Sequence, residues 1–131
     1  MPRNKRHYRV SLADALSAHD EALIFGGRPG IIDLSRVQSA IGRPYSGYHR
    51  TIQSKAAALV ESMSRNHGFV DGNKRTTLLL LHMLLVKSCY RLVPLAGEDI
   101  NAAVESLILG VVGRQIAIND AVQWFEMRVK R

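Results

Sequence analysis

The sequence has little cysteine, few aromatic residues and no long hydrophobic run. Its single cysteine, Cys89, cannot form an internal disulfide or supply a cysteine-based zinc site. The longest apolar run, Leu78–Val86, has nine residues with His82 inside it, which is less than half of a bilayer span. The first ten residues are basic but lack an apolar core, so they do not resemble a signal peptide. These absences exclude a disulfide scaffold and predict a cytoplasmic protein without a membrane partner.

The remaining composition is that of an ordinary globular domain. The chain has 131 residues, of which 47% are hydrophobic and 22% charged. This apolar fraction excludes a disordered chain, because such chains lack the residues that offset their ordering entropy. No repeat, low-complexity tract or Pro-rich linker divides the sequence, so we predict one domain over residues 1–131.

The formal net charge of +7 is concentrated in the first part of the chain. Residues 1–55 carry nine basic and four acidic side chains. Residues 1–10 contain four basic side chains and no acidic one: Arg3, Lys5, Arg6 and Arg9. Such an arm can hold nucleic acid or an acidic protein, and the alternative is a solvated, frayed terminus. Charge alone does not name a partner.

Capping signals and apolar periodicity predict an all-α fold. Ser11 with Asp14 forms a capping box for the first helix, and Asn119 is expected to cap the last. The helix at 73–87 is apolar on nearly all sides, which favours the buried centre of a bundle with His82 as a core residue. The predicted helices span about 12–25, 33–42, 51–66, 73–87, 98–109 and 120–130.

Residues 42–48 are predicted to be irregular, because Gly, Pro, Ser and Tyr dominate the segment. With its two tyrosines, this segment could be a short flap that covers a site, or it could only connect two helices.

The segment with the most chemical information is 65–76, RNHGFVDGNKRT, which leads into the apolar helix. The first amides of a helix have no intrahelical acceptor, and the helix dipole there favours anions. Gly72 permits close approach of a phosphate, because it has no Cβ. Lys74 and Arg75 add cationic donors in the same turn. The segment therefore predicts a phosphate site.

Two other side chains of this segment could supply a metal ligand and a base. Asp71 is a carboxylate of the kind that Mg²⁺ accepts together with phosphate oxygens, and His67 can act as a general base at neutral pH. Each has an alternative, since a loop histidine is often only exposed, and Asp71 or Asn73 can merely cap the helix. Phe69 is predicted to be an apolar plug that anchors the loop to the core.

The string His67–Arg75 resembles the Fic/Doc signature, His-Pro-Phe-x-Asp/Glu-Gly-Asn-Gly/Lys-Arg. Seven conserved positions match, including the lysine after asparagine that is typical of the Doc branch. The chain departs at Gly68, where most Fic proteins have proline, and at Leu79, where Doc has asparagine. The similarity covers nearly the whole chain and is strongest from His19 to Thr76.

This resemblance implies a compact helical Fic/Doc fold with one buried central helix, whose signature loop binds ATP and Mg²⁺. In Doc, the γ-phosphate is transferred to a threonine of elongation factor Tu and translation stops, whereas ordinary Fic enzymes transfer AMP. The resemblance thus implies a toxin kinase acting on a Ser or Thr hydroxyl, with AMP transfer as the alternative. An alternative of another class is a non-catalytic basic module that binds nucleic acid or protein.

Position by position, the resemblance makes His67 the base and Asp71 the Mg²⁺ ligand. Arg65 matches a basic position in Doc and could reach phosphate or target, or it could only complement the C-terminal dipole of its helix. The residues expected to hold the phosphates lie in one turn and are Gly72, Asn73, Lys74 and Arg75.

Many Fic proteins are restrained by an inhibitory helix, in which Ser or Thr is followed four residues later by Glu and then Gly or Asn. The nearest match, Ser17–Ala22, lacks the final Gly or Asn. By resemblance to Doc, restraint would come from an antitoxin whose disordered segment folds on the toxin, and nucleic acid would be contacted only through that antitoxin. His19 is predicted to be structural and to brace the signature loop.

Overall fold

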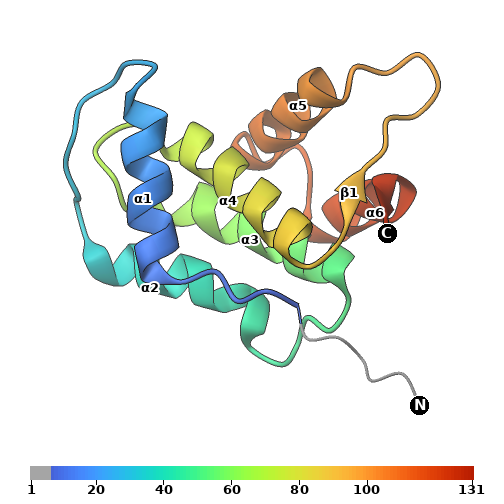
Figure 1. Cartoon of the computed structure of the whole chain (residues 1–131), viewed down its shortest axis with the longest axis horizontal. Helices are drawn as coiled ribbons and strands as arrows, with labels where there is room; N and C mark the ends of the chain where they lie inside the picture. Colours follow the sequence, from blue (N-terminus) through green and yellow to red (C-terminus); the bar gives the residue numbers. More distant parts are fainter. Residues whose placement is uncertain (1–6) are drawn as a thin grey trace.

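A computed structural model describes residues 7–131, and these residues are mostly helical (Figure 1). The α-helices are α1 (Leu12–Leu23), α2 (Leu34–Gly42), α3 (Ile52–Asn66), α4 (Asn73–Lys87), α5 (Ile100–Val112) and α6 (Ile118–Arg128). A short 3₁₀ helix, η1 (Arg43–Tyr45), follows α2. The two-residue strand β1 (Arg91–Leu92) pairs antiparallel with β2 (Val129–Lys130), with Arg91 opposite Lys130. The prediction of an all-α fold is confirmed.

Most helices begin where the sequence carries a capping residue. The Ser11 side chain accepts a hydrogen bond from the Asp14 amide at 3.1 Å, and Asp14 accepts one from the Ser11 amide at 2.9 Å, as the predicted capping box requires. Asp33 caps α2 by accepting a hydrogen bond from the Ser35 amide at 2.9 Å. The last helix differs, because it begins after Ala117 without a side-chain cap rather than at Asn119.

The helix at the centre of the bundle is α3, not α4. It packs against α2, η1, α4, α5 and α6, and it lies in the middle of Figure 1. Small residues over 56–58 are fully buried along it and let its neighbours approach closely. In contrast, α4 leaves Leu78, His82 and Val86 exposed. The predictions of a central α4 and a core His82 are therefore wrong. A helix that is apolar on nearly all sides gives no indication of which sides other helices will cover.

The segment before α1 is tied to the body of the molecule. The Tyr8 amide donates to the Ser88 Oγ at 2.8 Å. The Tyr45 hydroxyl donates to the Tyr8 carbonyl at 2.6 Å and accepts from the Val10 amide at 2.8 Å. The alternative of a frayed terminus is thus wrong for residues 7–10. Residues 1–6 lie outside the described part of the chain.

The segment beside the signature loop is the α1–α2 connection and not residues 42–48, which could have been a flap. Residues 42–48 contain η1, and their Tyr45 contacts the N-terminal segment and not the signature loop. The neighbour of the signature loop is the α1–α2 connection, where Ile31 forms a β-bridge with Phe69. The Val70 amide donates to the Gly30 carbonyl at 3.1 Å, which fixes the two segments side by side.

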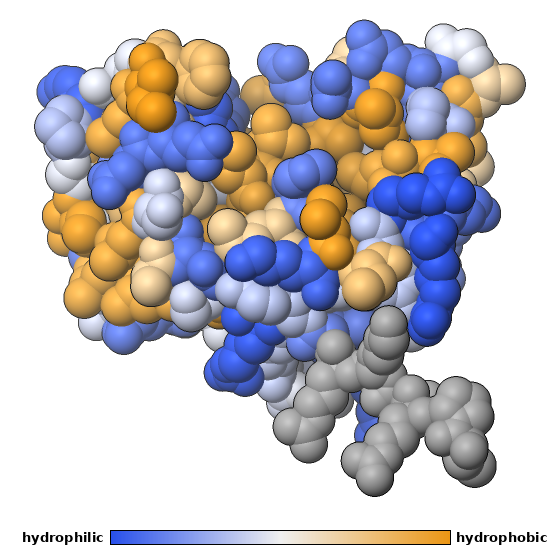
Figure 2. All heavy atoms as spheres, in the orientation of Figure 1, coloured by the Kyte–Doolittle hydropathy of each residue, from blue (hydrophilic) through white to orange (hydrophobic). Residues whose placement is uncertain are grey.

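The surface mixes apolar and polar side chains. Figure 2 shows apolar side chains interspersed with polar ones on the side of the α1–α2 connection, and a strongly hydrophilic strip on the side where the C-terminal segment lies. Ile24, Phe25 and Ile32 are among the exposed apolar residues of that connection. No helix within residues 7–131 combines the length and apolarity needed to cross a bilayer.

Candidate active site

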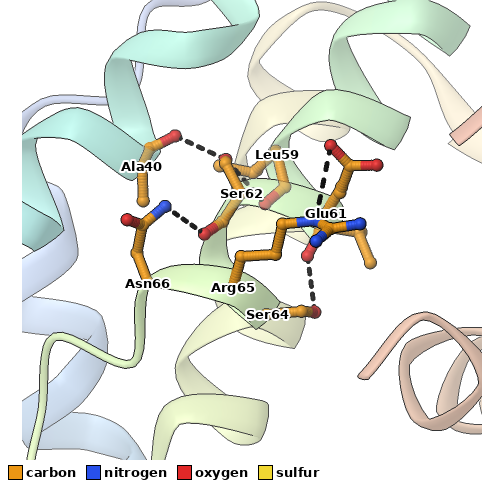
Figure 3. A network of polar contacts seen from close by, with 8 residues as sticks. Ala40, Leu59, Glu61, Ser62, Ser64, Arg65 and Asn66 are labelled. Carbon is orange, nitrogen blue, oxygen red and sulfur yellow. Dashed lines mark hydrogen bonds and ion pairs between the residues drawn. The ribbon is translucent and has the colours of Figure 1, made fainter. Parts of the chain in front are cut away.

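The signature loop starts at the end of α3, which is fixed to α2. The Ser62 hydroxyl donates to the Ala40 carbonyl at 2.7 Å, and the Asn66 side-chain amide donates to the Ser62 carbonyl at 2.7 Å (Figure 3). The next residue, His67, ends the helix with φ 19° and ψ 60°. Its side chain is exposed, so the chain leaves the helix at the residue predicted to be the base.

The loop after His67 is held by its own side chains and by α1. Phe69 is fully buried, and its ring stacks on His19 with centroids 3.8 Å apart and planes 8° from parallel. The Asn73 side chain accepts from the Phe69 amide at 3.2 Å and donates to the Phe69 carbonyl at 2.9 Å. His19 Nε2 donates to the Asp71 carbonyl at 2.8 Å. The predictions that Phe69 is a plug and that His19 braces the loop are confirmed.

The departure of Gly68 from the signature proline has a steric cause in this fold. A Cβ atom at Gly68 would lie 2.4 Å from Val37 Cγ2 and 3.1 Å from the Val37 amide nitrogen. The Gly68 carbonyl also accepts the amides of Ile32 and Asp33, at 2.9 and 3.3 Å. Because α2 and the residues before it lie directly against Gly68, this position has no room for a larger residue.

The start of α4 offers unused amides beside two cations. Gly72 precedes the helix with φ +78°, a left-handed conformation that favours glycine, and no side chain caps the helix. Within the described residues, the amides of Asn73, Lys74 and Arg75 have no protein acceptor. Lys74 and Arg75 are exposed beside these amides. Free amides and cations at a helix N-terminus can bind an anion.

Asp71 is held in place by backbone donors. Its carboxylate accepts from the Arg28 amide at 3.1 Å and from the Gly72 amide at 2.9 Å. These two hydrogen bonds are the main reason why the pKa of Asp71 lies below its usual value, so the group is ionised at neutral pH. An exposed, ionised carboxylate fits Mg²⁺, which takes one or two such ligands and shares phosphate oxygens. Within residues 7–131, no three His, Cys, Asp or Glu side chains form a metal cluster.

One cleft of about 620 Å³ brings most of the predicted residues together. Phe25 and Val112 form apolar walls that the sequence did not predict. Phe25 stands out only as an apolar residue before two glycines, and nothing local in the sequence marks Val112. The residues that line the cleft are Phe25, Gly26, Gly27, His67, Val70, Asp71, Gly72, Asn73, Lys74, Arg75 and Val112.

Two residues noted in the sequence do not reach this cleft. Arg65 lies in the last turn of α3 and pairs with Glu61 at 3.9 Å, outside the lining (Figure 3). Its position agrees with the alternative of a cation at a helix C-terminus. Leu79, where Doc has asparagine, packs against the core. Leu79 is not among the residues that line the cleft.

The fold and the cleft define a class of protein: a small helical protein in which a clamped His-x-Phe-x-Asp-Gly-Asn loop opens onto the start of a helix. The chain belongs to the Fic/DOC family, whose model matches residues 9–85. It is also similar to Toxin Doc of Mycolicibacterium smegmatis, with 41% identity over 61 residues. That match covers 42% of this chain and 46% of the relative. It therefore spans less than half the length of this curated relative.

Proposed function

We propose that the protein is a Doc-type toxin kinase of the cytoplasm, which transfers the γ-phosphate of ATP to a Ser or Thr hydroxyl of a protein. By resemblance, the target is elongation factor Tu, the result is arrest of translation, and an antitoxin neutralises the activity. The observation that carries this proposal is the placement of Lys74 and Arg75 at the start of α4, in one cleft with His67.

Each residue of the cleft has its own role in the proposed phosphoryl transfer. Such a transfer depends mainly on positioning the reacting groups and neutralising the phosphate charge. ATP bound with Mg²⁺ would supply the phosphoryl group. The free amides of α4, with Lys74 and Arg75, would bind phosphate oxygens, and ionised Asp71 would hold the metal ion. His67 is exposed at the cleft, where it accepts the proton of the attacking hydroxyl.

The side chain of Asn73 has a separate task in this scheme. Both of its polar atoms bond the backbone of Phe69, so they hold the loop in shape. Its contribution to phosphate binding then comes from its backbone amide.

One feature of the site favours kinase over nucleotidyl transfer, and the name of a similar protein supports the toxin part of the proposal. Lys74 stands where most Fic proteins have glycine, and a long cation there occupies space that a phosphate would otherwise use. The similar protein from Mycolicibacterium smegmatis is named Toxin Doc.

The experiment is incubation of the purified chain with cell extract and ATP labelled at either the α or the γ phosphate, followed by mass spectrometry. We expect γ-label and the mass of one phosphate on a Ser or Thr of one protein. Label from the α position would instead establish AMP transfer. No label, with nucleic-acid binding that weakens with salt and survives His67→Ala, would establish a non-catalytic module.

The toxin assignment is tested in cells. Induced expression is expected to arrest growth, and co-expression of a small neighbouring gene with an acidic, helix-prone tail should restore it. Free overexpression without growth arrest would contradict the assignment.

A further inference from the structure

A second cavity, of about 880 Å³, surrounds the N-terminal end of α3. The signature loop follows the opposite end of this helix, and 15 helical residues separate the two regions by about 22 Å. Figure 1 shows the same separation, with the α3–α4 loop and the N-terminal segment on different sides of the molecule. This cavity is therefore separate from the cleft of about 620 Å³ that the signature loop lines, which we call the signature cleft. Its lining includes His7, Arg9, Tyr45, His49, Arg50, Lys55, Tyr90 and Arg131.

The charges of this lining have one sign. Arg9, Arg50, Lys55 and Arg131 are cationic, and no Asp or Glu side chain is among the described residues that line the cavity. Burial lowers the pKa of Lys55. Burial and the neighbouring charges of Lys55 and Arg131 lower the pKa of His7. The combined field of these cations attracts anions.

Two basic side chains of the lining, Lys55 and His49, are held in position by hydrogen bonds. Lys55 Nζ donates to His7 Nδ1 at 2.8 Å and to the Arg50 carbonyl at 3.3 Å. His49 is only 8% exposed, although it lines the cavity, and its Nδ1 hydrogen-bonds with the Ser54 hydroxyl at 2.7 Å. A site with positioned donors loses less side-chain entropy when a ligand binds.

The aromatic rings of the cavity indicate which kind of anion fits. The Arg9 guanidinium lies over the Tyr45 ring at 4.9 Å, and that of Arg131 lies over the Tyr90 ring at 5.4 Å. Single-stranded nucleic acids are usually bound by stacking bases on aromatic faces. Here an arginine already occupies one face of each ring, which leaves less aromatic surface for stacking and places a phosphate-binding guanidinium group beside it.

We propose that this cavity binds a small anion that carries two or more phosphate groups, independently of the signature cleft. Its volume lies within the range of small-molecule sites, which is about 300–1,000 Å³. Four cations balance at least two phosphates, and guanidinium groups match phosphate oxygens in geometry. The carboxylates of an acidic peptide carry less charge per group than phosphates do.

The test is a titration of the full ¹⁵N-labelled chain with sodium tripolyphosphate, followed by NMR. We expect saturable shifts of the amides of residues 47–55. Arg50→Gln should weaken binding at these amides by about tenfold, as expected for loss of one charged contact. Arg50 is exposed, so this variant keeps the fold. The matched control, Lys74→Gln, should change only the shifts of residues 68–75.

Three outcomes would overturn the proposal. The first is the absence of saturable shifts in residues 47–55, or shifts that Arg50→Gln and Lys55→Gln both leave unchanged. The second is binding of a ten-nucleotide single strand at least tenfold tighter than tripolyphosphate at the same amides, which would assign the cavity to nucleic acid. The third is equal binding of a glutamate-rich peptide, which would assign it to an acidic protein. Phosphate or AMP transfer at the signature cleft is measured separately, so failure of either proposal leaves the other testable.

Discussion

At the residue scale, the candidate site depends on which side chains are free and which hold the loop. Phe69, His19 and Asn73 are committed to one another and to the backbone. His67 and Lys74 are exposed next to these buried, hydrogen-bonded residues. The exposed side chains make no core contacts, so replacing them should affect the reaction and not the stability. Replacing the buried side chains should lower the stability of the fold.

Replacement of His67 by alanine is therefore expected to abolish transfer of label from ATP without a change in the unfolding midpoint. The physical reason is that an exposed loop imidazole contributes a proton acceptor but no core contact. Label transfer and thermal unfolding followed by circular dichroism measure the two effects. His82→Ala is the matched control, because His82 is exposed on α4 outside the cleft, and it should keep activity. Activity in the His67 variant would remove this histidine from the mechanism.

Gly68→Ala should destabilise the fold by about 1–3 kcal/mol, the usual cost of overpacking a core. The added methyl group would lie 2.4 Å from the side chain of Val37, so α2 or the loop must move. Urea unfolding measures the change in the free energy of unfolding. The control is Gly42→Ala, where no atom lies within 4 Å of the new Cβ and helix propensity favours alanine. Equal stability of the Gly68 and Gly42 variants would contradict the steric explanation.

At the element scale, one ion pair joins the start of α5 to the end of α6. The Arg128 guanidinium donates to both carboxylate oxygens of Glu98, at 2.8 and 2.6 Å. It also lies over the Trp124 ring at 4.2 Å. The Arg128 side chain is only 9% exposed, so its charge has lost most of its hydration. The ion pair with Glu98 compensates for that loss.

The Glu98–Arg128 pair should make stability depend on pH. Hydrogen bonding to Arg128 lowers the pKa of Glu98 from 4.5 to about 2. A carboxylate with a lowered pKa stabilises the fold fully above pH 4.5, and this contribution disappears as the pH falls toward 2. Glu98→Gln should therefore lower the unfolding midpoint at pH 7, and the difference from the parent protein should shrink between pH 4.5 and 2.

Thermal unfolding over that pH range provides the measurement. Glu105→Gln is the control, because Glu105 is exposed on α5 and belongs to none of the described ion pairs. It should show no such convergence. A gap between parent and Glu98→Gln that stays constant from pH 7 to 2 would refute the linkage.

At the scale of the whole molecule, the bundle is closed by contacts between distant parts of the chain. The β1–β2 pair joins residues 91–92 to residues 129–130, and Tyr45 joins the end of η1 to residues 8–10. These contacts tie the basic cavity at the N-terminal end of α3 to both ends of the described chain.

Tyr45→Phe should release residues 7–10 from the body of the molecule. The hydroxyl makes two hydrogen bonds, so its loss leaves the Val10 amide and the Tyr8 carbonyl without this partner, at a cost of about 1–3 kcal/mol. Hydrogen exchange of the Val10 amide should become faster, and urea unfolding should occur at a lower concentration. Tyr48→Phe is the control, because Tyr48 is 87% exposed. Unchanged protection of Val10 would show that other contacts hold the segment.

Much of the fold could be predicted from the sequence because its signals are local. The capping box at Ser11 and Asp14 places the start of α1 correctly. The signature string also places the loop before α4, where the structure has it. The prediction of Asn119 as a cap is wrong, because α6 begins after Ala117 without a side-chain cap.

The sequence by itself determined the helical class, most helix boundaries and the signature loop, since caps, glycines and motifs act over a few residues. Only the tertiary structure decided that α3 is central, that His82 is exposed, and that Arg65 lies away from the cleft. It alone brought Arg9, Arg50 and Arg131 around one cavity. The physical reason is that burial and charge proximity depend on which elements become neighbours, and no single stretch of sequence carries that information.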